Sequence, residues 1–169
     1  MKTREICFTA LAIAMCSIFK LVFNFIPNVQ PVTTCLILLA MFVSLRVSLL
    51  TGFGTILLTS LLTSIGSWTI FQIIGWAIIS LIACKLKNFY PALIWSIVGA
   101  FVYGFVNTVS MVPYVGWIGL PVAWVGGLSF DLLHAVGNAV FMVLLFKLAQ
   151  NTQPKMQKWL STGQAIRHS

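Results

Sequence analysis

Acidic residues are almost absent from this chain, since Glu5 and Asp131 stand against ten Lys and Arg residues, and only 7% of all residues are charged. Hydrophobic residues make up 60% of the sequence, and the mean hydropathy is +1.03. So few polar groups cannot cover a soluble globule of 169 residues, which excludes a soluble domain and predicts an integral membrane protein. The net charge of +8 lies beside apolar segments, so we expect contact with anionic lipid headgroups and no nucleic-acid partner.

The motifs of catalysis and metal binding are also missing. The four cysteines are Cys7, Cys16, Cys35 and Cys84. They form no C-x-x-C pair, and we interpret them as small buried hydrophobic residues. Asp131 and His134 could supply two metal ligands, but the sequence offers no third, and it contains no H-E-x-x-H, no G-x-S-x-G and no phosphate-binding P-loop. We therefore expect neither an enzyme nor a metal site, and no cofactor in this chain.

The alternation of apolar and polar residues that marks a barrel strand is lacking, because the apolar runs are continuous. The sequence predicts an all-α membrane protein with membrane helices over 5–26, 32–45, 47–65, 69–84, 91–112 and 124–147. Residues 1–150 should form one six-helix domain, with a retained first helix, and residues 151–169 a polar cytoplasmic tail. The stretch 113–127, rich in Pro, Gly and Trp, is expected to be an exterior connection, either an aromatic belt or a lid over a pocket.

The first, third and fifth connections between these helices contain no charged residue. The basic residues outside the predicted helices gather on the side of the two termini, together with Lys147. By the positive-inside rule, both termini are cytoplasmic. We expect a multi-pass protein of the bacterial plasma membrane.

The segment 124–147 is apolar and long enough to span a bilayer, yet it carries Asp131, His134 and Asn138. An acid at membrane depth costs about 2.5 to 3.5 kcal/mol on insertion scales, so its presence indicates a function. At 100° per residue the three polar side chains share one stripe with Trp124 and Gly127. The opposite side carries Leu133, Val136 and Val140. The polar stripe should therefore face a cavity or a polar partner and not lipid.

Further polar groups fall in the outer half of the predicted bundle. The additional candidate binding residues are Lys20, Asn24, Asn28, Gln30, Trp68, Gln72 and Asn107. Lys20 lies at a depth similar to Asp131, which allows an ion pair or a shared ligand; the alternative is that Lys20 extends toward the exterior headgroups. Membrane amides often bond only between helices. Together, however, these groups predict a binding pocket that opens outward.

Ala10 and Ala14 place two small residues four apart in the cytoplasmic half of the first helix. Such spacing lets another helix approach closely. The pair could serve packing inside the bundle, or it could form a docking face for a partner.

Four stretches resemble the substrate-binding S components of energy-coupling factor (ECF) transporters. They read R-E-I-x-x-x-A-L-x-x-A at the N-terminus, I-P-N-V-Q-P-V-T in the first connection, G-S-W-T-I-F-Q-I-I-G-W-A, and F-D-L-L-H-A-V-G-N-A-V-F. The resemblance implies a vitamin-binding subunit that docks on a transmembrane coupling subunit and two ATPases, which hydrolyse the ATP. It also implies that Ala10 and Ala14 contact the coupling subunit and that the last three helices and the exterior connections hold the ligand.

Within that family the loops and the last helix look most like members assigned to cobalamin. Riboflavin, a pyridoxine-like ring or pantothenate are the other ligands to consider. Two further hypotheses fall outside the family. One is a stand-alone transporter in which Asp131 and His134 relay protons, and the other is a structural membrane subunit without a small-molecule ligand.

Overall fold

The computed structural model describes residues 2–25 and 28–162. Its elements are α1 (Thr3–Val22), the short 3-10 helix η1 (Phe23–Phe25), α2 (Val32–Phe42), α3 (Leu45–Leu62), α4 (Ser67–Ala83), α5 (Phe89–Val109) and α6 (Val112–Ser161). The described residues contain no strand, so the expected all-α fold is confirmed. Most helix boundaries lie within about three residues of the expected ones, because Gly66 directly precedes α4 and Pro91 lies in the first turn of α5.

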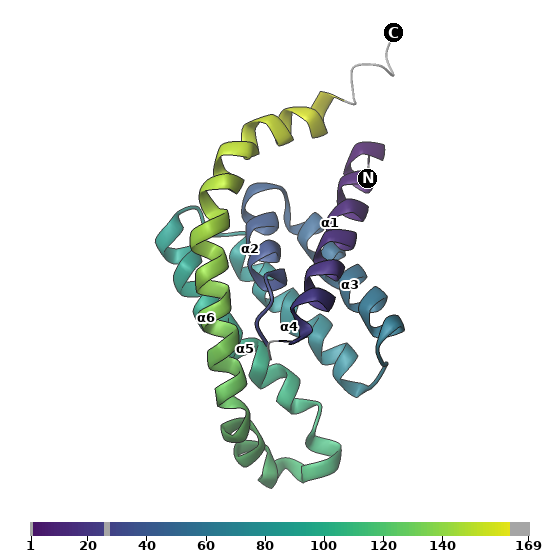
Figure 1. The fold of residues 1–169 in the computed structure, drawn as a ribbon, viewed down its shortest axis with the longest axis vertical. Coiled ribbons are helices and arrows are strands. Elements are labelled where there is room, and N and C mark those ends of the chain that lie inside the picture. The colour runs from purple at the N-terminus through teal and green to yellow at the C-terminus, as the bar shows by residue number, and fades with distance from the viewer. Residues whose placement is uncertain (1, 26–27, 163–169) are drawn as a thin grey trace.

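The helices alternate in direction and give the molecule two ends of different chemistry (Figure 1). What we call the basic end holds the start of α1, the connections α2–α3 and α4–α5, and the end of α6. Its basic residues are Lys2, Arg4, Arg46, Lys85, Lys87, Lys147, Lys155 and Lys158. The opposite, neutral end holds the connections 28–31, 63–66 and 110–111, which contain no charged residue.

The central helix is α2, although it is the shortest α-helix. Nine of its residues are buried, including Leu36 and Ile37, because α1, α3, α4, α5 and α6 all contact it. A helix that is apolar on every side is stable only where other helices cover it completely. Trp76 of α4 and Met142 of α6 are buried in the same core. This helix therefore ties the other five together.

Four described helices are long and apolar enough to cross a membrane: α1, α3, α5 and α6. Two others, α2 and α4, have 11 and 17 residues, fewer than the roughly 20 that a bilayer requires. Leu11, Leu61 and Ile94 are examples of large apolar side chains that point outward. The chain is thus a multi-pass membrane protein.

The expectation of an irregular connection over 113–127 is wrong. These residues belong to α6, which is interrupted only at Gly116, where φ is 70° and ψ is 171°. Pro113 is tolerated in the first turn of the helix, where an amide hydrogen would have no partner anyway. The positive φ at Gly116 breaks the helix locally, which a residue with a side chain rarely does. The turn between α5 and α6 is therefore shorter than the Pro and Gly content indicated.

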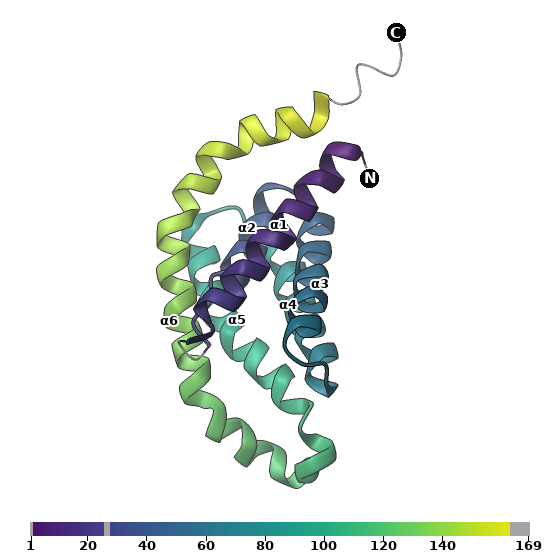
Figure 2. The ribbon, with the colours of Figure 1, turned by 45° about the vertical axis from the view of Figure 1, so that its right-hand side comes forward.

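The far end of α6 is also longer than expected. The helix continues through Pro154 to Ser161, so the beginning of the predicted tail is helical, while residues 163–169 lie outside the described part of the chain. The last turns of α6 bend over the basic end toward the start of α1 (Figure 2). At the other end, the last turns of α5 and the first turns of α6 project beyond the remaining helices, as both ribbon views show.

Candidate ligand-binding site

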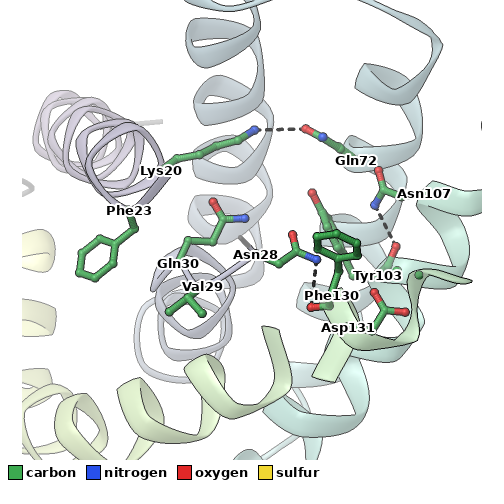
Figure 3. A pocket seen from close by; sticks show the side chains of 12 residues that line it. Lys20, Phe23, Asn28, Val29, Gln30, Gln72, Tyr103, Asn107, Phe130 and Asp131 are labelled. Carbon is green, nitrogen blue, oxygen red and sulfur yellow. Dashed lines mark hydrogen bonds between the residues drawn. The ribbon is translucent and has the colours of Figure 1, made fainter. Parts of the chain in front are cut away.

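A partly open cavity of about 360 Å³ lies at the neutral end. Residues from α1, α4, α5, α6 and the connection before α2 form its wall (Figure 3). Six of the predicted binding residues line it: Lys20, Asn28, Gln30, Gln72, Asn107 and Asp131. These side chains are far apart in the sequence, and the helices bring them together because each element reaches the neutral end at this point.

Lys20 turns into the protein and not toward the headgroups. Its Nζ donates a hydrogen bond of 3.1 Å to Oε1 of Gln72 and lies 5.4 Å from the ring centroid of Trp76. Within the described residues, these contacts are to an amide and an indole face, and not to the carboxylate of Asp131. The ammonium therefore borders the cavity as a cation that no acidic side chain neutralises by direct contact.

Asp131 presents the acidic group of the cavity from α6. Only 4% of its surface is exposed, and its carboxylate lies against Gly104 of α5, where a Cβ atom would collide with it. The carboxylate fits there because Gly104 lacks a side chain. This close approach of α5 and α6 holds the acid at the cavity wall.

His134 and Asn138 share a face with Asp131 and are fully buried, as the stripe predicted. Neither, however, lines the cavity. His134 Nε2 is 3.0 Å from the hydroxyl oxygen of Thr33. That hydroxyl also accepts a 3.2 Å hydrogen bond from Nε1 of Trp76. The imidazole thus connects α6 with α2 and, through Thr33, with α4.

Asn138 also connects helices, one turn further along α6 from the cavity. Its Nδ2 donates to the carbonyl of Ser96 in α5 at 3.0 Å, while Thr34 of α2 donates to its backbone carbonyl at 3.1 Å. Interhelical bonds of this kind stabilise membrane bundles. In this structure His134 and Asn138 fix the helices that carry the cavity instead of facing its interior.

The remaining predicted residues have mixed positions. Asn28 and Asn107 are held in the wall by hydrogen bonds to the carbonyls of Phe130 and Tyr103, at 3.2 and 2.8 Å. Trp124 packs edge-on against Phe105, with ring centroids 5.4 Å apart, and does not line the cavity. Trp68 borders a second, neighbouring cavity. Asn24 lies in η1, and its side chain is outside the described part of the structure.

Sequence reasoning named no aromatic or small residue of the cavity wall as a ligand, although it placed Gly127 on the polar stripe. The wall residues that it did not name as ligands are Phe23, Val29, Tyr103, Gly104, Gly127 and Phe130. Tyr103 stacks on Trp76, with centroids 5.7 Å apart and planes inclined by 23°. Its position four residues before Asn107 was the available signal, since such residues share a helix face. The aromatic rings offer flat apolar surface between the polar groups.

The wall thus combines one ammonium, one carboxylate, several amides and aromatic rings. Such a set can hold a polar small molecule by hydrogen bonds and ring contacts. The described residues contain no group of three His, Cys, Asp or Glu side chains that could hold a metal ion.

Ala10 and Ala14 lie on the outer surface of α1, where both are exposed. The buried face of this helix is formed by Thr9, Ala12, Cys16 and Ser17. The alanines are therefore available to a partner and do not pack inside this bundle.

Comparison of the chain with protein-family models, with curated proteins and with solved structures finds no match.

Proposed function

We propose that this protein is a substrate-binding membrane subunit that captures a polar micronutrient from outside the cell. The observation that carries the proposal is the convergence of Lys20, Gln72, Asn107 and Asp131 on one cavity in an otherwise apolar helical protein. Charged groups inside membrane proteins are costly and generally mark pathways or binding sites. A cavity of 360 Å³ also falls in the usual range for small-molecule sites.

The distribution of charge supports entry of the ligand from outside. The basic end carries the start of α1, the end of α6 and the basic connections, so the positive-inside rule assigns it to the cytoplasm. The neutral end, where the cavity opens, then faces the exterior. In this orientation all six α-helices cross or partly cross the membrane, and the shorter helices α2 and α4 do so within the bundle.

The sequence motifs support membership of the S components of ECF transporters. In that arrangement the chain docks on a transmembrane coupling subunit and two ATPases, and ATP is hydrolysed by those partners. The absence of a P-loop from this sequence agrees with that division of labour. The exposed pair Ala10 and Ala14 supplies a surface on which a partner helix can approach closely.

The size of the cavity bears on the choice of ligand. At about 30 Å³ per water molecule in the liquid, 360 Å³ corresponds to roughly a dozen waters, which suits a compact ligand with one or two rings. Cobalamin, favoured by the sequence resemblance, is much larger, so it would extend through the open side of the cavity or require α5 and α6 to move outward. A pyridoxine-like ring, riboflavin and pantothenate are the smaller alternatives.

Native mass spectrometry of protein purified from its own host, with an absorbance spectrum, tests the proposal. The expected result is a co-purified vitamin at one copy per chain, released by denaturation; a corrin or flavin would be visible by its colour. Reconstituted protein should transport this ligand only when the coupling subunit, the ATPases and ATP are present. Uptake by the chain alone under a proton gradient would instead support the relay hypothesis for Asp131 and His134, and the absence of any ligand would support a structural subunit.

A further inference from the structure

A second cavity, of about 200 Å³, lies beside the first between α1, α3 and α4. We call it the side cavity and the first one the main cavity. Four of the residues in its wall carry hydroxyl groups: Thr59, Ser60, Thr63 and Ser64. Lys20 and Gln72 belong to both cavities. The hydrogen bond between their side chains is therefore the boundary that separates the two spaces.

The ammonium at this boundary is not neutralised by a carboxylate. Within the described residues, Nζ of Lys20 contacts the amide oxygen of Gln72 and the ring of Trp76. One hydrogen bond to a neutral amide leaves further N–H groups of the ammonium free. A partly buried cation is costly unless an opposite charge pairs with it. An anion that enters either cavity would supply such a charge next to Lys20.

Other donors lie next to the ammonium. The amide nitrogen of Gln72 remains free when its oxygen accepts from Lys20, and it can donate to the same anion. The Ser60 side chain is 95% buried, since its exposed fraction is 5%, and it contributes a hydroxyl group to the wall. Thr59 and Thr63, by contrast, already donate to carbonyls of their own helix. The available donors are thus concentrated around Lys20, Gln72 and Ser60.

We propose that the side cavity is a subsite for an anionic group, a carboxylate or a phosphate, of the ligand whose rings occupy the main cavity, with Lys20 as its counter-ion. This inference rests on the proposed function, because it assumes that the main cavity binds a small molecule. It adds the chemical class of that molecule: an anion at one end, and at the other a hydrogen-bond donor or cation for Asp131. Both charged side chains would then have a partner when the ligand is bound.

Three aromatic probes that differ mainly in charge test the proposal: benzoate, phenyl phosphate and benzamide. Their binding to the purified full-length protein, freed of any co-purified ligand, is followed by calorimetry and by tryptophan fluorescence, because Trp68 lines the side cavity and the Trp76 ring lies 5.4 Å from Nζ of Lys20. We expect at least one of the anions to bind about tenfold or more tightly than benzamide, as charge-assisted hydrogen bonds are stronger than neutral ones. The stronger anion identifies the group as carboxylate or phosphate.

The Lys20→Met variant should remove this preference by lowering the affinity for the anions to about that for benzamide. Ser60→Leu should do the same by filling the side cavity while Lys20 stays in place, which also keeps the test valid if Lys20→Met does not fold. Lys85→Met is the matched control, since it removes a cation at the basic end, and it should bind all three probes as the wild type does.

Equal affinity for the anions and benzamide, or an anion preference that survives both Lys20→Met and Ser60→Leu, would overturn the anionic subsite. So would a failure of all three probes to bind at millimolar concentration. None of these results decides the proposed function, which depends on the co-purified ligand. A bound vitamin without an anionic group would refute the subsite and retain the function.

Discussion

Gly104 and Asp131 are in direct contact across the interface of α5 and α6, and the carboxylate occupies the space where any larger residue than glycine would place its Cβ atom. The acid that the sequence identified as costly is therefore accommodated by the absence of a side chain on the neighbouring helix. The carboxylate can lie at the cavity wall only when residue 131 is an acid and residue 104 has no side chain.

The first prediction concerns this contact. Gly104→Ala should push the Asp131 carboxylate out of its place and lower the affinity for the native ligand by about tenfold, the equivalent of one lost charge-assisted hydrogen bond. Calorimetry of the purified protein measures the effect. Gly126→Ala is the control, because a Cβ atom there meets nothing within 4 Å. Unchanged affinity in Gly104→Ala would mean that the position of Asp131 does not matter for binding.

The second prediction concerns the buried hydroxyl of Thr33, which joins His134 and Trp76. Thr33→Val leaves both partners buried without their hydrogen bond. The free energy of unfolding in mixed detergent micelles should fall by about 1 to 2 kcal/mol.

The control for this prediction is Thr152→Val, whose exposed hydroxyl donates only within its own helix. Its unfolding free energy should stay within about 0.5 kcal/mol of the wild type. If the two valine variants were equally stable, the Thr33 hydroxyl would not contribute to holding α2, α4 and α6 together.

The third prediction concerns the contacts of Arg4 with Trp159 and Thr162, which join the start of α1 to the end of α6. Arg4 donates from Nη1 to the carbonyl of Trp159 at 2.8 Å and to the hydroxyl of Thr162 at 3.0 Å, and its guanidinium lies 5.5 Å from the Trp159 ring centroid. Arg4→Ala should speed amide hydrogen exchange over 155–161 and change global stability by less than about 1 kcal/mol, because the contacts are exposed. Arg46→Ala removes another exposed arginine of the basic end and should leave exchange in this segment unchanged. Equal exchange in both variants would show that the contacts of Arg4 do not stabilise the end of α6.

The fourth prediction concerns the outer face of α1. Ala10→Trp or Ala14→Trp should abolish ATP-driven transport by the assembled complex, since a large ring prevents close approach of a partner helix. Ligand binding by the isolated chain should remain normal, because both alanines point away from the bundle. Ile118→Trp, at a residue that is 95% exposed on α6, should leave both activities intact. A loss of binding together with transport would argue against a docking role.

The fifth prediction concerns orientation in the membrane. In a variant whose four cysteines are replaced by alanine, Ile65→Cys lies in the α3–α4 connection at the neutral end and Asn88→Cys in the α4–α5 connection at the basic end. A membrane-impermeant maleimide should label the first in intact cells and the second only after lysis. The reverse pattern would place the cavity on the cytoplasmic side and exclude capture from outside.

The sequence by itself determined the helical class, the separation of basic and neutral ends, and the face of α6 that carries Asp131, His134 and Asn138. Composition and helical periodicity are local properties, and they suffice to say which residues avoid lipid. Four wall residues of the main cavity, Lys20, Gln72, Asn107 and Asp131, could be named in this way, because polar groups inside an apolar segment are conspicuous. Asn28 and Gln30 were named from the connection that precedes α2.

Only the tertiary structure decided what each of those polar groups meets. Periodicity gives the direction of a side chain around its helix but not the element that packs against it. The buried helix α2 brings Thr33 and Thr34 against the part of the polar stripe that lies farther from the neutral end. His134 and Asn138 therefore bond between helices, while Asp131, one turn nearer the neutral end, reaches the cavity. Lys20 likewise bonds to Gln72 of α4 because the tertiary arrangement of the helices, and not the sequence spacing, sets which side chains come within hydrogen-bond distance.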